Sequence, residues 1–362
     1  MIAPFKNKKR IVIKIGSSLL IEDDHVRINW LKSLIEDISA LKKLGKEIII
    51  VSSGTIALGR SKLILKNDKL TLAEKQASAA IGQIVLMSKY QDCFAEFNIH
   101  VAQILVTDDD SADRNRYLNT KRTINTLLKN GIIPIVNEND TIAVEEIKIG
   151  DNDRLAARIA QISAADLLIL LSDIDGLYDK NPKTNPDAKF ISVIEKIDKK
   201  VEKMAGGAVS NVGTGGMITK IKAAKMAFNL GCNCIISSGI APHPIRRIIS
   251  DKKFTLFKAD GKKINAKKQW IADCLSANGE VIIDNFAAKA LMKNSSLLPV
   301  GVLKVIGEFQ KGDVIFIKDI KGRHIANGIA KYGSFTASSV IGKQRQAELV
   351  QRDDLVLLSS HS

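Results

Sequence analysis

Short apolar runs rich in isoleucine and valine recur along the first 250 residues of the chain. Six of them predict strands, at residues 11–15, 47–51, 100–106, 132–136, 167–171 and 234–237. Their hydrophobicity is continuous rather than alternating, which is typical of strands buried on both faces of a parallel sheet. Helical patterns lie between most of them, so the sequence predicts an α/β fold with a mainly parallel sheet between helices. The strand order is not readable, so other α/β topologies stay open.

Apolar side chains recur at helical spacing in three segments of this region. The stripes consist of Trp30, Leu34, Ile38 and Leu41; of Leu155, Ile159 and Ile162; and of Met217, Ile221, Ala224 and Phe228. Gly45 and Gly231 follow the first and third stripes, so both helices are expected to end at a glycine.

The pattern changes near Lys252. Short strand-like pieces separated by turn signals follow at 280–284, 300–307, 313–319 and 324–330. A short helix is expected at 285–293, with Asp284 as its N-cap. The sequence therefore predicts three parts, which are a domain at 1–255, a basic linker at 256–274 and a small, mostly β domain at 275–355.

Composition narrows the class of protein. The hydrophobic fraction of 45% is ordinary for a globular protein, and no apolar run approaches the ~20 residues that span a bilayer. Lys14 interrupts the first apolar run, which argues against a signal peptide. The cysteines form neither a CxxC pair nor a metal-ligand spacing, so reduced thiols are expected. We expect a cytoplasmic protein without a membrane partner.

The net charge of +15 could indicate a nucleic-acid partner. Residues 252–268, however, hold 7 lysines against 1 aspartate, whereas residues 269–362 hold 11 Lys and Arg against 9 Asp and Glu. The excess in this part of the chain is therefore concentrated in one segment, and a solvated linker explains it at least as well as a binding face.

A short polar segment follows each of five predicted strands, and we call these segments tips. They read Gly16-Ser17-Ser18, Ser52-Ser53-Gly54, Thr107-Asp108-Asp109-Asp110, Asn137-Glu138-Asn139-Asp140 and Ser172-Asp173. Ligands of open parallel sheets bind outside the carboxyl ends of the strands. Any single tip can be an ordinary turn, but five together favour an active site along this edge.

Lys14 lies inside the first predicted strand. Burying an unpaired ammonium group is costly, so Lys14 needs an anionic partner. That partner can belong to an active site or to a purely structural ion pair, and both interpretations stay open.

Residues 211–220 place three glycines and a lysine at the start of the third predicted helix. The spacing is not that of a P-loop, in which glycine directly precedes lysine. Free backbone N–H groups and the helix dipole at Thr214, Gly215 and Gly216 would favour an anion. Lys220 is expected to be an exposed lysine in the first turn, within reach of that anion. The alternative is only a tight turn before a helix.

Residues 151–153 form a second polar cluster, which we expect just before a helix. Capping would account for one of Asp151, Asn152 and Asp153. With Glu145 and Glu146 upstream, the surplus carboxylates suggest a role in binding Mg²⁺ or in orienting lysines.

The histidines lie away from these tips, and no cysteine has an evident base partner, so acid–base or nucleophilic catalysis finds little support. Two lysines, a dipolar anion site and acidic residues fit phosphoryl transfer, which depends on positioning and charge stabilisation. An acceptor carboxylate is ionised at neutral pH, with a pKa of about 4, and needs no general base.

Six stretches resemble successive motifs of the amino-acid kinase family: IVIKIGSSLL, VSSGTIALG, IVNENDTIA, KIGDNDRLAA, LSDIDGLYDKNP and VGTGGMITKIKAA. Three later stretches resemble a PUA domain: GEVIIDNFAAKAL, SSLLPVGVLKVIGEFQKGDVIFI and GRHIANG. The resemblance covers nearly the whole chain, and the combination of the two domains is far more specific than any single motif. Within the family, the residues of these motifs and the order of the motifs along the chain are most similar to those of members that phosphorylate glutamate.

The resemblance implies ATP-dependent phosphorylation of the side-chain carboxylate of L-glutamate to glutamyl 5-phosphate, the first step of proline biosynthesis. It further implies Mg²⁺ as a cofactor, a homo-oligomer and feedback inhibition by proline. No direct metal ligand is assigned by the motifs.

The motif positions imply roles for individual residues. Lys14 and Lys220 would contact the transferring phosphate, and Asp153 would orient both lysines. Glutamate would be bound by Ser53, Gly54, Asp140, Asp151 and Asn152. The ATP site would contain Lys14, Gly16, Ser17, Ser172, Asp173, Thr214, Gly215, Gly216, Met217, Ile218, Thr219 and Lys220.

Two alternatives stay open. The acceptor could be aspartate, acetylglutamate, carbamate or uridylate, although the GDND element and the PUA domain argue against these. The chain could instead bind RNA through the PUA domain, although its near-neutral charge weighs against that because phosphate contacts need Lys and Arg.

Overall fold

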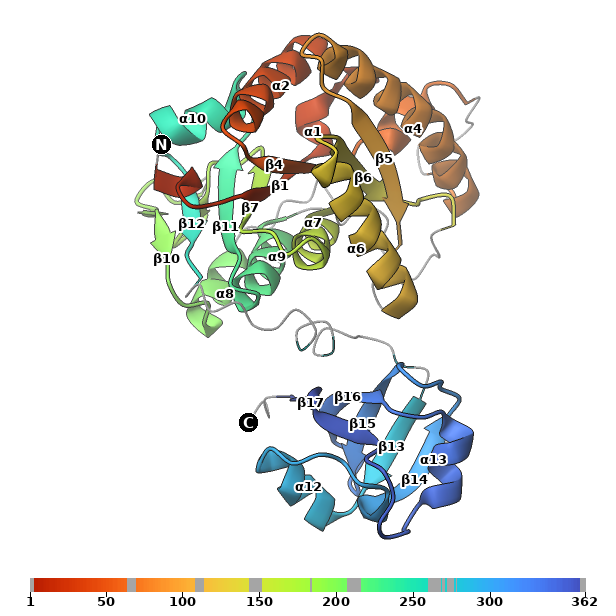
Figure 1. Cartoon of the computed structure of the whole chain (residues 1–362). Helices are drawn as coiled ribbons and strands as arrows, with labels where there is room; N and C mark the ends of the chain where they lie inside the picture. Colours follow the sequence, from red (N-terminus) through yellow and green to blue (C-terminus); the bar gives the residue numbers. More distant parts are fainter. Residues whose placement is uncertain are drawn as a thin grey trace. The chain divides into compact units, whose positions relative to one another are not determined.

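The computed structural model describes residues 3–63, 70–107, 114–142, 152–182, 184–206, 216–259, 268, 271, 277 and 279–358 (Figure 1). The chain divides into two compact units, residues 1–108 with 119–263, and residues 109–118 with 264–362. Much of the expected linker at 256–274 lies outside the described residues. Among the helices of the described residues, none has the length and apolar character needed to cross a membrane.

The first unit is built on an eight-stranded sheet. Its strand order is β10 (Val193–Ile194), β12 (Thr255–Phe257), β11 (Asn233–Ser238), β7 (Leu167–Ser172), β1 (Arg10–Ile15), β4 (Glu47–Val51), β6 (Ile133–Glu138) and β5 (Val101–Val106). Neighbouring strands pair in parallel except β11 with β12. The prediction of a mainly parallel sheet is confirmed, and each of the six predicted strands is present.

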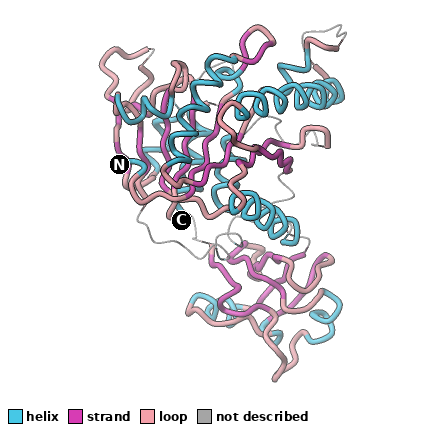
Figure 2. The backbone as a smooth tube through the Cα atoms, turned by 45° about the horizontal axis from the view of Figure 1, so that its top comes forward, coloured by secondary structure: helices cyan, strands magenta, loops and turns pink. Residues whose placement is uncertain are grey.

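Helices cover both faces of this sheet (Figures 1 and 2). The helices of this unit are α1 (Ser17–Leu20), α2 (Ile28–Lys43), α3 (Thr55–Arg60), α4 (Leu72–Ala95), α6 (Arg114–Lys129, from residue 119 onward), α7 (Asn152–Ile162), α8 (Lys199–Gly206), α9 (Met217–Asn229) and α10 (Pro244–Ser250). The three predicted helices correspond to α2, α7 and α9. Short elements complete the unit: η1 (Ala3–Phe5), the pair β2 (Ile21–Glu22) and β3 (His25–Val26), and the pair β8 (Leu177–Tyr178) and β9 (Phe190–Ile191).

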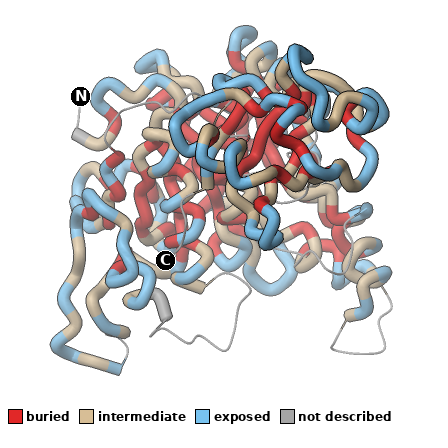
Figure 3. The backbone as a smooth tube through the Cα atoms, turned by 90° about the horizontal axis from the view of Figure 1, so that it is seen from below, coloured by how far each residue is buried: buried red, intermediate tan, exposed pale blue. Residues whose placement is uncertain are grey.

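The two faces of β1 differ in their neighbours. Ile11, Ile13 and Ile15 belong to the large apolar core that includes α2 and α4. Val12 and Lys14 alternate with them and therefore point to the opposite face. The helices α7 and α9 pack against each other there, and α7 also lies against β1 (Figure 1). The residues of β1, β4, β6, β7 and β11 are buried along most of each strand, and Figure 3 shows buried residues in red.

The second unit is a five-stranded, mostly antiparallel sheet. Its order is β14 (Val302–Gly307), β13 (Gly279–Ile283), β15 (Val314–Asp319), β16 (His324–Ala330) and β17 (Val350–Leu357), with α12 (Asn285–Met292), η2 (Pro299–Gly301) and α13 (Ser334–Val340) beside it. The predicted N-cap is confirmed, because the Asp284 side chain accepts a hydrogen bond of 2.7 Å from Ala287 N. The sequence did not reveal β17, whose middle is interrupted by charged residues, or α13, which is rich in Ser and Thr.

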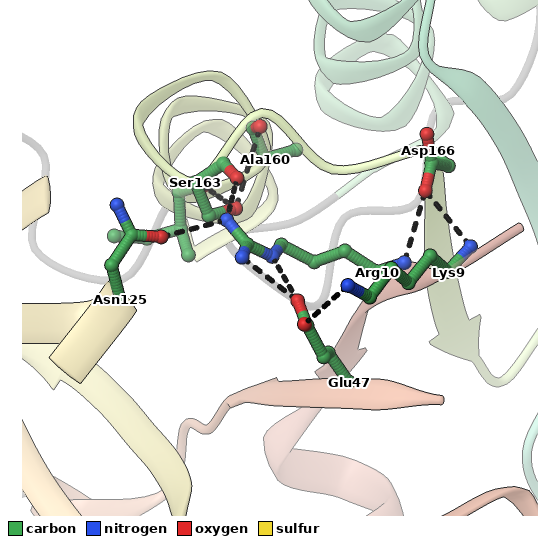
Figure 4. A network of polar contacts seen from close by, with 8 residues as sticks. Lys9, Arg10, Glu47, Asn125, Ala160, Ser163 and Asp166 are labelled. Carbon is green, nitrogen blue, oxygen red and sulfur yellow. Dashed lines mark hydrogen bonds and ion pairs between the residues drawn. The ribbon is translucent and has the colours of Figure 1, made fainter. Parts of the chain in front are cut away.

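Arg10 connects several elements at the amino ends of the strands (Figure 4). Its guanidinium group donates to Glu47 of β4 at 2.8 Å, to Asn125 of α6 at 2.9 Å and to the Ser163 carbonyl after α7. The carboxylate of Asp166 accepts from the backbone N–H groups of Lys9 and Arg10. The edge opposite the polar tips is therefore fixed by a dense polar network.

We expect Arg10→Met to lower the free energy of unfolding by about 2–4 kcal/mol, because Glu47 and the Ser163 carbonyl lose a charged donor. Lys9→Met is the matched control. Lys9 also lies 3.3 Å from Glu47, but its side chain is 75% exposed, so its loss should cost under about 1 kcal/mol. Urea unfolding of both variants measures the difference, and equal effects would contradict the structural role of Arg10.

Candidate active site

Lys14 extends from β1 toward α7 and is only 8% exposed. Its Nζ lies 2.8 Å from Oδ1 of Asp153. The expected anionic partner is therefore present, and it comes from a segment more than 130 residues away in the sequence.

A second lysine shares the same carboxylate. Lys220 Nζ lies 3.1 Å from Oδ2 of Asp153, and the Thr219 hydroxyl lies 2.9 Å from the same oxygen. Lys220 is 3% exposed, so the expectation of an exposed first-turn lysine was wrong. The reason is that α9 packs on α7, which turns this face of its first turn inward.

Asp153 is 1% exposed. Burial alone would raise the pKa of its carboxyl group, but the ammonium groups of Lys14 and Lys220 outweigh burial and hold the pKa below its ordinary value. Asp153 is therefore ionised at neutral pH. Two ammonium groups around one carboxylate leave a net positive charge, which suits a phosphate group.

Asn152 lies beside this cluster on α7 and is 3% exposed. Its Nδ2 lies 2.6 Å from the Ser52 carbonyl, 2.9 Å from Ser53 Oγ and 3.0 Å from Asn137 Oδ1. Its Oδ1 has no hydrogen-bond partner among the described residues. A buried amide with an unused acceptor is suited to bind a donor group of a ligand.

The expected position of residues 151–153 needs a correction. Helix α7 begins at Asn152, so Asn152 and Asp153 lie inside its first turn rather than before it. Their side chains contact the tip after β4, β6, β1 and α9 instead of capping the helix. Asp151 lies outside the described residues, as do Glu145 and Glu146.

Asp140 lies just beyond the end of β6 and is 8% exposed. Burial raises the pKa of its carboxyl group to about 6, and a hydrogen bond of 3.3 Å from the Thr55 hydroxyl partly opposes that rise. Gly54 precedes Thr55 with a φ of 105°, where a side chain would also press against Ile21. The tip after β4 therefore depends on glycine to bring Ser53 and Thr55 into place.

The remaining predicted residues lie along the same edge of the sheet. Gly16 caps α1 close to the Lys14 ammonium group, and Ser17 approaches Gly54. Ser172 ends β7 and donates a hydrogen bond of 2.8 Å to Asp173. The start of α9 contains Gly216, Met217, Ile218, Thr219 and Lys220. Thr214 and Gly215 lie outside the described residues, as do Asp108, Asp109 and Asp110.

Other residues of the site were not assigned roles from the sequence. Asn137 donates to Gln83 of α4 at 2.8 Å, and the Ser52 hydroxyl lies 3.0 Å from Tyr90 of the same helix. Ser52, Asn137 and Thr55 belong to or directly follow polar tips, so their positions gave a usable signal. Nothing in the pattern of α4 pointed to Gln83 or Tyr90.

Metal-binding side chains are not clustered in the part of the chain that the structure describes. No group of three or more His, Cys, Asp or Glu residues there could hold a metal ion. Among the described cysteines, Cys93, Cys232 and Cys234 are buried and free.

Comparison with known proteins shows which families the two parts of the chain match. Residues 9–238 match the amino acid kinase family, and residues 279–348 match the PUA domain. The chain is 44% identical to the glutamate 5-kinase of Paramagnetospirillum magneticum, over 98% of this chain and 99% of the relative. It is 46% identical to the glutamate 5-kinase of Agrobacterium fabrum, over 98% of this chain and 94% of the relative.

A solved structure shares the fold of the first unit. The carbamate kinase of Giardia lamblia bound to AMP-PNP superposes with a TM-score of 0.50 at 16% identity, covering 70% of this chain and 99% of that chain.

Proposed function

The chain belongs to the amino acid kinase family, and we propose that it transfers the terminal phosphoryl group of ATP to the side-chain carboxylate of L-glutamate. The product is glutamyl 5-phosphate, and the reaction is the first step of proline biosynthesis. The proposal rests mainly on one observation: the buried lysines Lys14 and Lys220 both pair with the carboxylate of Asp153, at the edge of the sheet where the parallel strands end.

The two lysines supply the charge that the transfer needs. Negative charge is spread over the oxygens of the transferring phosphoryl group, and preorganised ammonium groups stabilise it without rearranging in the reaction. Lys14 approaches from β1 and Lys220 from α9, so they can contact the group from two sides. Asp153 contacts both and keeps them in place. The glutamate carboxylate is already ionised, so no general base is required.

Glutamate would be oriented by the polar groups beside the lysines. The Asp140 carboxylate is suited to the α-ammonium group, and the unused Oδ1 of Asn152 can accept a hydrogen bond from the same group. The Ser53 hydroxyl and the backbone of Gly54 are suited to the α-carboxylate. Asp151 would complete this set. The side-chain carboxylate is then free to extend toward the lysines.

ATP would bind along the start of α9 and the tip of β7. The α9 N-terminus favours phosphate through its free N–H groups and its dipole, and Thr214, Gly215 and Gly216 precede its first turn. Gly16, Ser17, Ser172 and Asp173 would line the rest of the site.

Mg²⁺ would enter with the nucleotide. This ion usually binds through substrate phosphates and one or two carboxylates while keeping several waters. The exposed carboxylate of Asp173, beside Ser172, fits that arrangement. Bound Mg²⁺ would neutralise phosphate charge.

The proposal includes homo-oligomeric assembly and feedback inhibition by proline, and both rest on family membership. Proline carries an ammonium group and a carboxylate on one carbon, as glutamate does. Asp140 and Asn152 could therefore hold either molecule, which makes competition with glutamate the expected form of inhibition.

The decisive test uses ATP with a panel of amino acids, and hydroxylamine to trap an acyl phosphate. We expect hydroxamate with glutamate and none with aspartate or acetylglutamate, and we expect no ADP release when carbamate or uridylate replaces the amino acid. ADP release without trapping, or hydroxamate with another acceptor only, would overturn the proposal.

The pKa of Asp140 gives a prediction for the pH profile. The kcat/KM for glutamate reports ionisations of the free enzyme. Because the pKa of Asp140 is raised to about 6, its carboxyl group becomes protonated as the pH falls through 6 and can no longer pair with the α-ammonium group. We expect kcat/KM for glutamate to fall about tenfold per pH unit below 6. An acid limb that first appears near pH 4 would contradict this role.

A further inference from the structure

Thr55 is the first residue of α3, and its hydroxyl group points at the Asp140 carboxylate. The distance from Oγ1 to Oδ2 is 3.3 Å, and both side chains are buried. Among the described residues, the Asp140 carboxylate accepts its side-chain hydrogen bond from this hydroxyl group. A buried carboxylate with so little support depends strongly on that single donor.

The position of Thr55 is itself fixed by a close crossing of two helices. Helix α3 packs on α4 through Gly59 and Gly82. A β-carbon on Gly82 would collide with the Thr55 carbonyl, and one on Gly59 would collide with the Ser78 carbonyl. Because both residues are glycines, the backbones of α3 and α4 can touch. Thr55 therefore has little freedom to move away from Asp140.

We propose that Thr55 is a positioning residue for the amino-acid substrate: its hydroxyl group holds the Asp140 carboxylate in the orientation that receives the α-ammonium group. This inference rests on the proposed function, because it assumes that Asp140 binds the amino group of glutamate. The Thr55 hydroxyl group bonds to Asp140 and not to Asp153, the carboxylate that holds the two lysines, so the proposed role concerns capture of the amino acid.

Charged groups on neighbouring elements do not take over this task. Charged residues on these elements include Glu138 on β6, Arg60 on α3, Lys14 on β1 and Asp153 on α7. Lys14 and Asp153 pair with each other, and the pKa of Asp140 is set by its burial and by the hydrogen bond from Thr55. The Thr55 hydroxyl is therefore the group whose removal should most change how readily the carboxyl group ionises.

The test compares Thr55→Val, which removes the hydroxyl group and keeps the shape, with Thr55→Ser, which keeps the hydroxyl group. For Thr55→Val we expect the KM for glutamate to rise about tenfold, and the acid limb of kcat/KM to move up by about one pH unit. The kcat at saturating glutamate and the KM for ATP should stay within about twofold of the parent. Thr55→Ser should match the parent in all four quantities.

Two outcomes would overturn the inference. One is a Thr55→Val enzyme whose glutamate KM and acid limb are unchanged. The other is a parallel rise in the KM values for glutamate and ATP with a lower melting temperature, which would indicate a structural role only. If Thr55→Val does not fold, Thr55→Ala must give the same shift of the acid limb. Failure of the parent enzyme to form glutamyl hydroxamate would instead refute the proposed function.

Discussion

Asp153→Asn should lower kcat by about a thousandfold and destabilise the first unit at the same time. The carboxylate contacts both buried lysines, at 2.8 and 3.1 Å. An asparagine cannot neutralise them, so two ammonium groups repel each other in a site with little solvent. Removing one partner of a buried ion pair costs about 3–5 kcal/mol. Displaced lysines would also stabilise the transition state less. Losing one preorganised donor lowers the rate by about 10²–10³-fold.

The pH dependence of this effect has a definite sign. The pKa of Asp153 is lowered in the folded state, so its ion pairs stabilise the fold at any pH above the unfolded value of about 3.9. That stabilisation is lost only as the pH falls through the still lower folded pKa. The difference in unfolding free energy between parent and variant should therefore be constant from pH 6 to 8 and shrink only in strong acid.

A matched control separates burial from charge. Asp251→Asn removes a carboxylate that pairs with Arg247 at 3.0 Å, but both side chains are about half exposed. Exposed pairs contribute about 0–1 kcal/mol, so this variant should keep its stability and its turnover. Urea unfolding and steady-state kinetics on both variants test the comparison. Near-normal turnover in Asp153→Asn would contradict the proposal that Asp153 holds Lys14 and Lys220 in place.

The fold was predictable because its strands are buried on both faces. Continuous runs such as IVIKI and LLILL stand out in the sequence, and their parallel pairing follows from the helices between them. Strand order was not predictable, because it depends on which helices cover which face. The missed strand β17 carries Arg352, Asp353 and Asp354 in its middle, so its apolar signal is broken.

The site was predictable in composition but less so in its arrangement. Lys14 stood out because a lysine inside a buried strand demands an anion, and Asp153 now occupies that position. The burial of Lys220 and the inward direction of Asn152 were not readable, since both depend on packing between α7, α9 and the sheet. The contact of Thr55 with Asp140 joins segments 85 residues apart and leaves no periodic trace in the sequence.

Lys220→Met should lower kcat by about 10²–10³-fold while leaving the stability within about 1 kcal/mol of the parent. Asp153 keeps Lys14 as a partner in this variant, and methionine fills the same space without an ammonium group that must be buried. Alanine is the poorer choice, because Lys220 is 3% exposed and its truncation would leave a cavity. The catalytic and structural effects are thus separable at Lys220 but not at Asp153.

Lys222→Met is the control for Lys220→Met. Lys222 lies two residues further along α9, and its side chain is exposed. We expect it to keep parental values of kcat and of the KM for ATP. Single-turnover measurement of glutamyl phosphate formation, trapped as the hydroxamate, isolates the chemical step from product release. Parental single-turnover rates in Lys220→Met would show that Lys14 alone stabilises the transferring group. A loss confined to the KM for ATP would instead limit Lys220 to nucleotide binding.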